Sequence, residues 1–482
     1  MNNTNSLKIV LSVALALFTA HSAAADPAAI AQPSELTLTI LHDNDLHGHI
    51  LPFAYTETAV SKVEMPSVGG AARRATLIRR LRKDIKNPTL LLDSGDAFTR
   101  GPLTNAYEGI ADIEAMNAVG YDVAAIGNNE FKALDGVDDK NAAGAQAALL
   151  QAVKRSRFPW VCANTVDEKG AFLEGVQPYV VRNIDGVRVG ILGLTAPRSA
   201  SYPQTKGWKI SDPITVAKEW IPKARAHCDV LIALTHIGDD LDKKLAAQTS
   251  GLDAIVGGDS HTFLYKALEV ANTDGVKVPI VQDGEFGVRL GRFDLHLLRD
   301  AQQHWHLGSY HYALLPVSKD IPEAEDVKAA VEPYVKPMLN VVGHLNEIAA
   351  TPDARNVQTA QVFVDAMREQ MKTDLALTSG ADGFFEVFRH KDVTRYDVYA
   401  AMPFHDNVST AQLKGSDIQD LLKKFPKTVV SGDVSHLDGD KTYSVALIDF
   451  IAHSVYKLPA ASVQDTDRDS RDVVIGYLSR RG

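Results

Sequence analysis

Five short segments of this chain each pair an apolar run with Asp, His or Asn at or just beyond its end. In order they are TILHDNDLHGHI, LLLDSGDAFTRG, AAIGNNEF, LIALTHIG and AIVGGDSHTF. Short apolar runs separated by helical patterns predict buried strands of a layered α/β domain. In open α/β sheets the ligand site lies beyond the carboxyl ends of the strands. The segments therefore predict one polar site assembled from five strand ends.

Strand and helix patterns alternate through the first two thirds of the chain. Strands are expected at residues 36–41, 89–92, 123–126, 187–192, 230–234 and 254–256, and helices at 73–83 and 142–154. The first of these helices carries the basic residues Arg73, Arg74, Arg79, Arg80, Arg82 and Lys83. A basic run on a helix is usually a solvated face, so we expect these side chains in solvent rather than around a bound anion.

The polar residues of the five segments have the chemistry of metal ligands, because carboxylate, imidazole and amide oxygen donors hold divalent cations. Asp45 and His47 lie two residues apart, which on an extended segment would point both side chains the same way. Asp259 and His261 repeat this spacing and would supply one ligand to each of two ions. The carboxylate of Asp96 has two donor oxygens and is suited to bridge those ions.

Two further donors come from single residues, an amide oxygen from Asn128 and an imidazole from His236. Any one candidate alone would be a structural residue by default. Five segments in one order, each at a strand end, favour the metal interpretation instead. Together they indicate a hydrolytic site for two divalent ions, with the candidate ligands Asp45, His47, Asp96, Asn128, His236, Asp259 and His261.

The five segments resemble the ordered signature of the calcineurin-like metallophosphoesterases, and within them the periplasmic and cell-surface 5'-nucleotidase family. That pattern is D-x-H, GD, GNHE, an apolar strand ending in H, and GH-x-H or GH-x-Q. GGAARRATLIRRLR and PFHDNVSTAQLKGSDIQDLL also resemble the family, so the likeness runs from about Leu36 to the C-terminus. It implies a layered α/β/β/α metallophosphoesterase domain at residues 34–318, a linker helix at 319–350 and a smaller α/β 5'-nucleotidase C-terminal-like domain at 351–482.

The resemblance also implies how the ligands divide between the ions and what the site does. One ion would be held by Asp45, His47, Asp96 and His261, and the other by Asp96, Asn128, His236 and Asp259. The implied activity is metal-dependent hydrolysis of a small-molecule phosphate ester, with nucleotides among the candidates. The alternatives are a cyclic phosphodiesterase, a sulfur-ester hydrolase, or a binding protein that keeps its metals without turnover.

The chain departs from the family pattern in two of the segments. Asn129 stands where GNHE has the histidine that protonates the leaving group, and Lys132 replaces its paired Asp unless a small insertion moves that role to Asp135. Because an amide cannot exchange a proton near neutral pH, we expect Asn129 to orient the phosphate instead. Asp259 replaces the first histidine of GH-x-H, and the added oxygen favours Mn²⁺ or Mg²⁺ over Zn²⁺, which stays possible.

The N-terminus has the pattern of a secretory signal at residues 1–25. Lys8 precedes the apolar residues 9–18, and a run of three alanines ends at Ala25. We expect cleavage there and a periplasmic or secreted protein, with an uncleaved anchor as the alternative. The net charge of the whole chain is −10, and removing a segment whose only charge is Lys8 brings it to −11. This balance disfavours polymeric nucleic acid as a partner.

The C-terminal third has weaker signals. Prolines at 316, 322, 333 and 337 mark a linker, and the amphipathic VQTAQVFVDAMREQM opens the second domain. Ser379 and the Phe384 region replace the family's Asn and Arg that meet the substrate. Phe384, Phe385, Phe388 or Tyr456 could stack a base, although such aromatic residues are more often core. The two cysteines, Cys162 and Cys228, either pair or remain buried thiols.

Overall fold

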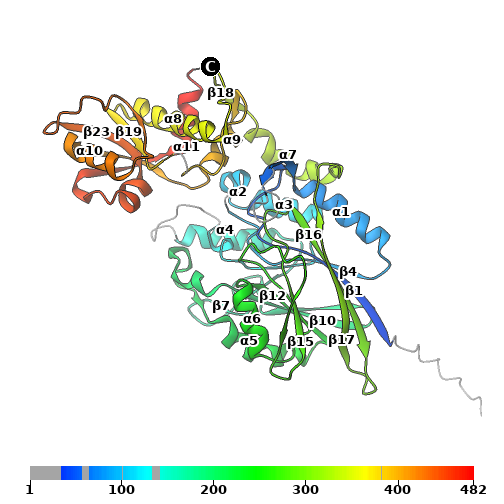
Figure 1. Cartoon of the computed structure of the whole chain (residues 1–482). Helices are drawn as coiled ribbons and strands as arrows, with labels where there is room; N and C mark the ends of the chain where they lie inside the picture. Colours follow the sequence, from blue (N-terminus) through cyan, green and yellow to red (C-terminus); the bar gives the residue numbers. More distant parts are fainter. Residues whose placement is uncertain (1–33, 57–63, 100, 133–141, 381–382, 482) are drawn as a thin grey trace, which may run out of the picture. The chain divides into compact units, whose positions relative to one another are not determined.

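The computed structural model describes residues 34–56, 64–99, 101–132, 142–380 and 383–481 (Figure 1). The expected signal at residues 1–25 and Asp135 lie outside these ranges. Within them, none of the helices combines the length and the apolar character that crossing a membrane demands.

Two sheets form the framework of the first domain. The seven-stranded sheet has the order β17 (Trp305–Pro316), β16 (Arg289–Arg299), β1 (Glu35–Asp43), β4 (Thr89–Asp93), β5 (Val123–Ala125), β6 (Trp160–Val161) and β8 (Val176–Gln177). The six-stranded sheet has the order β14 (Leu268–Ala271), β15 (Lys277–Val281), β13 (Ala254–Val256), β12 (Val230–His236), β10 (Val187–Thr195) and β9 (Tyr179–Ile184). In each sheet the central strands run parallel, so their carboxyl ends share one edge.

Alternating side chains place the two sheets face to face. Ile40 of β1 and Ile232 of β12 belong to one buried cluster between the sheets. On the outer faces, Leu41 belongs to a buried cluster with residues of helices α1 (Ala71–Asp84), α3 (Ile110–Val119) and α4 (Ala142–Arg155), and Leu231 belongs to another with residues of α5 (Pro213–Arg225) and α6 (Asp239–Gln248). The expected α/β/β/α layering is confirmed (Figure 1). The strand expected to reach residue 126 ends one residue earlier, at Ala125.

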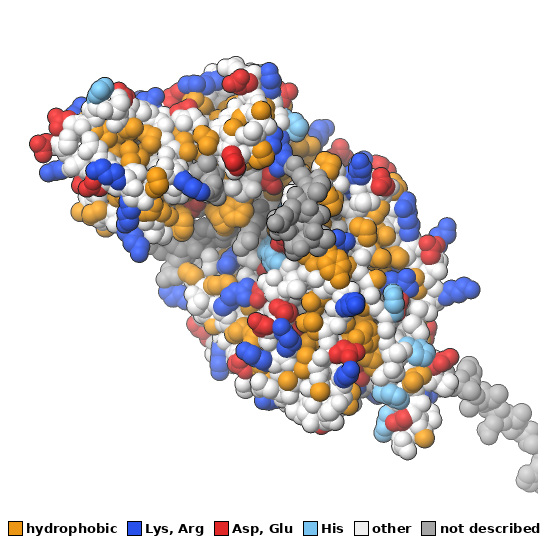
Figure 2. Space-filling view, viewed as in Figure 1, with side chains coloured by type: hydrophobic (Ala, Val, Ile, Leu, Met, Phe, Trp, Pro, Cys, Tyr) orange, Lys and Arg blue, Asp and Glu red, His pale blue; other side chains and the backbone are white. Residues whose placement is uncertain are grey.

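The expectation of a fully solvated basic helix is wrong for the first turn of α1. Arg73 and Arg74 are buried, and Arg74 Nε lies 3.4 Å from the Asp43 carboxylate beneath the helix. A buried carboxylate needs a charged partner, which is why the helix turns this arginine toward the sheet. Arg79 and Arg80 further along are exposed, as expected. On the face that Figure 2 shows, Lys and Arg side chains are interspersed with Asp and Glu.

The second domain has its own sheet, in the order β22 (Val429–Ser431), β19 (Leu375–Thr378), β23 (Thr442–Ile448), β21 (Asn407–Lys414) and β24 (Val463–Asp469). Helices α8 (Pro352–Met371) and α11 (Ser470–Leu478) contribute to its core, α8 being the expected amphipathic stretch. This half also contains α7 (Glu325–Met338), which lies in the expected linker range, α9 (Arg395–Ala401) and α10 (Gly415–Lys424).

Most of the aromatic candidates for base stacking belong to this core. Phe384, Phe388 and Tyr456 are buried. Phe385 is 53% exposed and meets Phe404 edge to face. Of the four residues, Phe385 is therefore the one whose ring is accessible to a ligand.

The two cysteines are unpaired, which decides between the alternatives that the sequence left open. Cys162 and Cys228 are both buried and free of a disulfide. Burial raises the pKa of each thiol to about 11, so neither has the thiolate character of a reactive cysteine.

Candidate metal centre

The candidate ligands lie at the shared carboxyl edge of the two sheets. Five strand ends contribute: Asp45 and His47 follow β1, Asp96 follows β4, Asn128 follows β5, His236 is the last residue of β12, and Asp259 and His261 follow β13. Three of these strands belong to the seven-stranded sheet and two to the six-stranded sheet. The packing of the sheets is therefore what brings the segments together.

The loops that carry the ligands are tightly turned, so the extended geometry expected for the two-apart pairs is wrong. Asp45 and His47 have φ of 52° and 46°, Asp259 and His261 have 86° and 53°, and Asp96 has 59°. Residues other than glycine rarely adopt this left-handed region unless the surrounding structure holds them there. Here the backbone N–H groups of Asp45 and His47 donate to the carbonyls of Gly95 and Asp96, both at 2.9 Å. Strain in the loops thus accompanies the assembly of the site.

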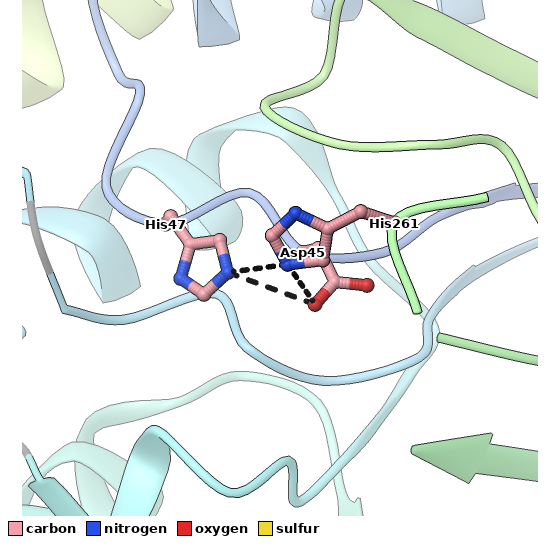
Figure 3. Close-up of side chains that lie close together, drawn as sticks. All are labelled: Asp45, His47 and His261. Atoms are coloured by element: carbon pink, nitrogen blue, oxygen red, sulfur yellow. Dashed lines mark hydrogen bonds and ion pairs between the residues drawn. The ribbon is translucent and has the colours of Figure 1, made fainter. Parts of the chain in front are cut away.

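Asp45, His47 and His261 form a first group of donors (Figure 3). The three side chains point toward one another from two loops. Asp45 Oδ1 lies 3.2 Å from His261 Nε2 and 3.6 Å from His47 Nε2, and the two Nε2 atoms are 3.2 Å apart. The other oxygen, Asp45 Oδ2, accepts hydrogen bonds from Asn44 Nδ2 and the Asp259 N–H. Oδ1 is thereby left directed at the two imidazoles.

Asp45, Asp96 and His236 form a second group. Asp96 Oδ2 lies 3.1 Å from His236 Nε2 and 3.7 Å from His47 Nε2, so this carboxylate reaches an imidazole of each group. Asp259 Oδ1 lies 3.5 Å from His236 Nε2. Asp45 Oδ1 and His236 Nε2 are buried without a hydrogen-bond partner of suitable geometry. Buried polar atoms of this kind are costly unless something binds them, so these residues fit divalent cations.

Opposite charges hold this cluster together. Although burial opposes it, the neighbouring His236 keeps the pKa of the Asp96 carboxyl well below its usual range. Burial likewise opposes ionisation of His236, but Asp96 and Asp45 raise the pKa of its imidazole. For His261, burial is outweighed by Asp45 and Glu285, which raise the pKa to about 10. Metal binding at these imidazoles therefore has to release protons.

Glu285 is a supporting residue that the sequence did not reveal. Its carboxylate accepts a hydrogen bond from His261 Nδ1, and its other oxygen accepts from Tyr55 Oη at 2.9 Å. A carboxylate on the far nitrogen of a histidine fixes the ring so that Nε2 is available to a metal. Glu285 follows β15 in no recognisable ligand motif, so nothing in the sequence alone singles it out.

Replacing Glu285 by glutamine is expected to weaken metal binding by about 10- to 100-fold, because the ring of His261 loses its charged partner. Isothermal titration with Mn²⁺ measures this directly. Glu269 forms a comparable carboxylate contact on the surface with Tyr310, so Glu269→Gln serves as the matched control and should leave the affinity unchanged. Equal affinities for both variants would contradict a role for Glu285.

The loop of residues 127–129 holds the Asp96 carboxylate through hydrogen bonds. The Asn129 N–H donates to Asp96 Oδ1 at 2.7 Å, and Asn129 Nδ2 donates to Asp96 Oδ2 at 2.5 Å. Glu130 accepts from the backbone N–H of Asp96 and of Gly127, which ties the loops after β4 and β5 together. Nζ of Lys132, the proposed replacement for the family's Asp, lies 4.2 Å from the centre of the Tyr202 ring.

Arg198 is the second site residue that the motifs missed. It lies in the turn η3 (Pro197–Ser201) after β10, and its guanidinium contacts Asn128 and Asp259. A signal for it did exist, because β10 is a parallel strand beside β12 and its carboxyl end opens onto the same edge. The segment TAPRS after that strand carries no carboxylate or histidine, which is why a search for metal ligands passes over it.

Comparison with known proteins places this geometry in a family. The chain matches the calcineurin-like phosphoesterase model over residues 38–263 and the 5'-nucleotidase C-terminal domain model over residues 341–436. It is 27% identical over 434 residues to the trifunctional nucleotide phosphoesterase protein YfkN of Bacillus subtilis (strain 168), a match that covers 82% of this chain but 28% of that protein. It is 28% identical over 431 residues to the 5'-nucleotidase of Bos taurus, covering 81% of this chain and 71% of the relative.

A solved structure extends the likeness to both domains. The 5'-nucleotidase precursor from Thermus thermophilus superposes with a TM-score of 0.68 at 27% identity, covering 92% of this chain and 96% of that one. The two family models follow each other along the chain in the same order as the two domains of the structure. The chain therefore belongs to the calcineurin-like phosphoesterases and carries the C-terminal domain of the 5'-nucleotidases.

Proposed function

We propose that this chain is an exported, metal-dependent phosphohydrolase that cleaves small-molecule phosphate esters, with nucleotides as the first substrates to test. The observation that carries the proposal is the convergence of Asp45, His47, Asp96, His236 and His261 in two groups whose ligand atoms lie within 4.8 Å of one another. Names of relatives that include nucleotide phosphoesterase and 5'-nucleotidase support the substrate class. Two ions are proposed, one for each group of donors.

Some residues of the site would hold the ions, and others would position those ligands. Divalent ions, when bound, supply the Lewis acidity that activates water and neutralises phosphoryl oxygens. Asp96, within reach of both groups, would hold them in one unit. Asn129 would hold Asp96 in place through its two hydrogen bonds, in addition to the phosphate-orienting role that the sequence predicts for it. Carboxylate oxygens of Asp45, Asp96 and Asp259 lie 3.8, 3.1 and 3.5 Å from His236 Nε2, and this share of oxygen donors favours Mn²⁺ or Mg²⁺.

A phosphate-release assay tests the proposal. Purified protein, stripped of metal, is assayed on nucleoside monophosphates, an aryl phosphate and cyclic nucleotides with Mn²⁺, Mg²⁺ or Zn²⁺. We expect release that a chelator abolishes and added metal restores. Turnover that persists in chelator would contradict metal dependence, and bound metal with no turnover on any substrate would favour a binding protein instead.

We propose export because Lys8, the apolar residues 9–18 and the alanines ending at Ala25 have the pattern of a cleaved signal. Sequencing the N-terminus of protein recovered from outside the cytoplasm should give a chain that begins at Asp26. A chain that still begins at Met1 would contradict cleavage.

A further inference from the structure

Arg198 contacts two of the candidate ligands of the second ion. One guanidinium nitrogen donates to Asp259 Oδ2 at 2.6 Å, and the other donates to Asp259 Oδ1 and, at 2.5 Å, to Asn128 Oδ1. Asn128 and Asp259 are both candidate ligands of the second ion. The candidate ligands of the first ion contact one another instead, with Asp45 Oδ1 directed at His47 and His261.

The contact has the geometry of a strong and specific one. Two parallel hydrogen bonds from a guanidinium fork to a carboxylate are both charge-assisted and directional. The side-chain oxygens that Asp259 and Asn128 would offer to an ion are the oxygens that accept from Arg198. A divalent cation and a guanidinium also repel each other at such a distance. The two cations therefore exclude each other from these oxygens.

The turn that carries Arg198 is firmly anchored, while the side chain itself can leave. Asn164, which is buried, holds the end of β10 by accepting from the Thr195 N–H and donating to the Thr195 carbonyl, each at 2.9 Å. Thr205 Oγ1 donates to the Ser199 carbonyl at 2.7 Å. The Arg198 side chain is 50% exposed, so its guanidinium can rotate into water without moving the backbone.

We infer that Arg198 competes with the second metal ion for Asn128 and Asp259, so that the two ions load in order. The group of Asp45, His47 and His261 fills first, and the second ion binds only as Arg198 withdraws. This inference rests on the proposed two-ion function. It gives the chain a reason to carry Asp259 together with an arginine, because the pair keeps the carboxylate neutralised until the second ion arrives.

Titration of the metal-stripped full-length protein with Mn²⁺ tests the order. Calorimetry gives the two dissociation constants, and electron paramagnetic resonance separates an isolated Mn²⁺ from a coupled pair. The wild type should bind one ion tightly and a second more weakly. Arg198→Ala should tighten the second constant by about tenfold or more, the usual size of a charge-assisted hydrogen bond lost, and leave the first within about twofold.

Two further variants separate competition from a general charge effect. Arg198→Lys keeps the charge but loses the fork, and should give an intermediate second constant. Arg188 makes a comparable bidentate pair with Asp229 on the surface, so Arg188→Ala should leave both constants unchanged. Equal constants in the wild type, or a second constant that Arg198→Ala does not alter, would overturn the inference.

The outcome is distinguishable from that of the phosphate-release assay. Protein that binds Mn²⁺ in two unequal steps but releases no phosphate would contradict the proposed hydrolase and leave the competition standing. If the protein releases phosphate but Arg198→Ala leaves the second dissociation constant unchanged, the competition is contradicted and the proposed hydrolase stands.

Discussion

Replacing Asp96 by asparagine is expected to lower metal-dependent phosphate release by about a thousandfold. Bound ions contribute several kcal/mol of transition-state stabilisation in enzymes of this chemistry, and each 1.36 kcal/mol is a factor of about ten in rate. Asp96 lies within reach of His236 in one donor group and His47 in the other, so a neutral amide there weakens both groups at once. It also leaves the buried imidazole of His236 without its principal carboxylate partner.

The measurement combines steady-state phosphate release with the metal content of the purified variant. Asp122 provides a matched control, because it also bonds a buried strand, through the Leu91 N–H, but precedes β5 and so lies at the opposite edge of the sheet. Asp122→Asn should keep its metal and its rate. The thermal unfolding temperatures of both variants show whether a loss of activity comes from the metal site alone or from a destabilised fold. An Asp96→Asn protein with a normal rate and a normal metal content would contradict the assignment of Asp96 to the metal centre.

The sequence predicts where the site lies in the fold more accurately than it predicts the backbone conformation of the loops that form it. Strands such as β1 and β12 are continuous apolar runs, which local pattern reveals, and the rule that parallel strands end at one edge then gathers Asp45 and His236. The positive φ of Asp45 and His47 could not be read in this way. It arises from hydrogen bonds to Gly95 and Asp96, about fifty positions further along the chain.

The residues that the sequence missed share one physical property, since each acts through a partner far away in the chain. Arg74 is buried because Asp43 lies under α1, and Glu285 matters because of His261. Arg198 is informative only beside Asn128 and Asp259. A composition or a motif reports what a residue can do, whereas these contacts depend on how two sheets pack. Basic or acidic residues outside motifs therefore remain ambiguous until the fold is known.

Restoring a histidine at position 129 together with an aspartate at position 132 is expected to speed cleavage of adenosine monophosphate by about 100-fold or more. An alkoxide leaving group needs a proton, and general acid catalysis is typically worth ~10² to 10⁴ in rate. Asn129 cannot supply one, and Lys132 cannot orient an imidazole as a carboxylate would. The wild type should therefore cleave 4-nitrophenyl phosphate, whose leaving group is stable as an anion, far faster than the nucleotide.

The ratio of the nucleotide rate to the aryl phosphate rate isolates the effect of proton donation from the other effects of the substitutions. Asn129→His also removes the hydrogen bond from Nδ2 to Asp96, while the backbone N–H can still donate to Asp96 Oδ1. If Asp96 is held less firmly, the cleavage rates of both substrates fall. The rate on the aryl phosphate measures that fall, and the ratio of the two rates is not changed by it. Asn129→Ala supplies the control, because it loses the same hydrogen bond without gaining an acid. If the wild type cleaves both substrates at equal rates, the proton already has another source and position 129 is not where the family's acid was lost.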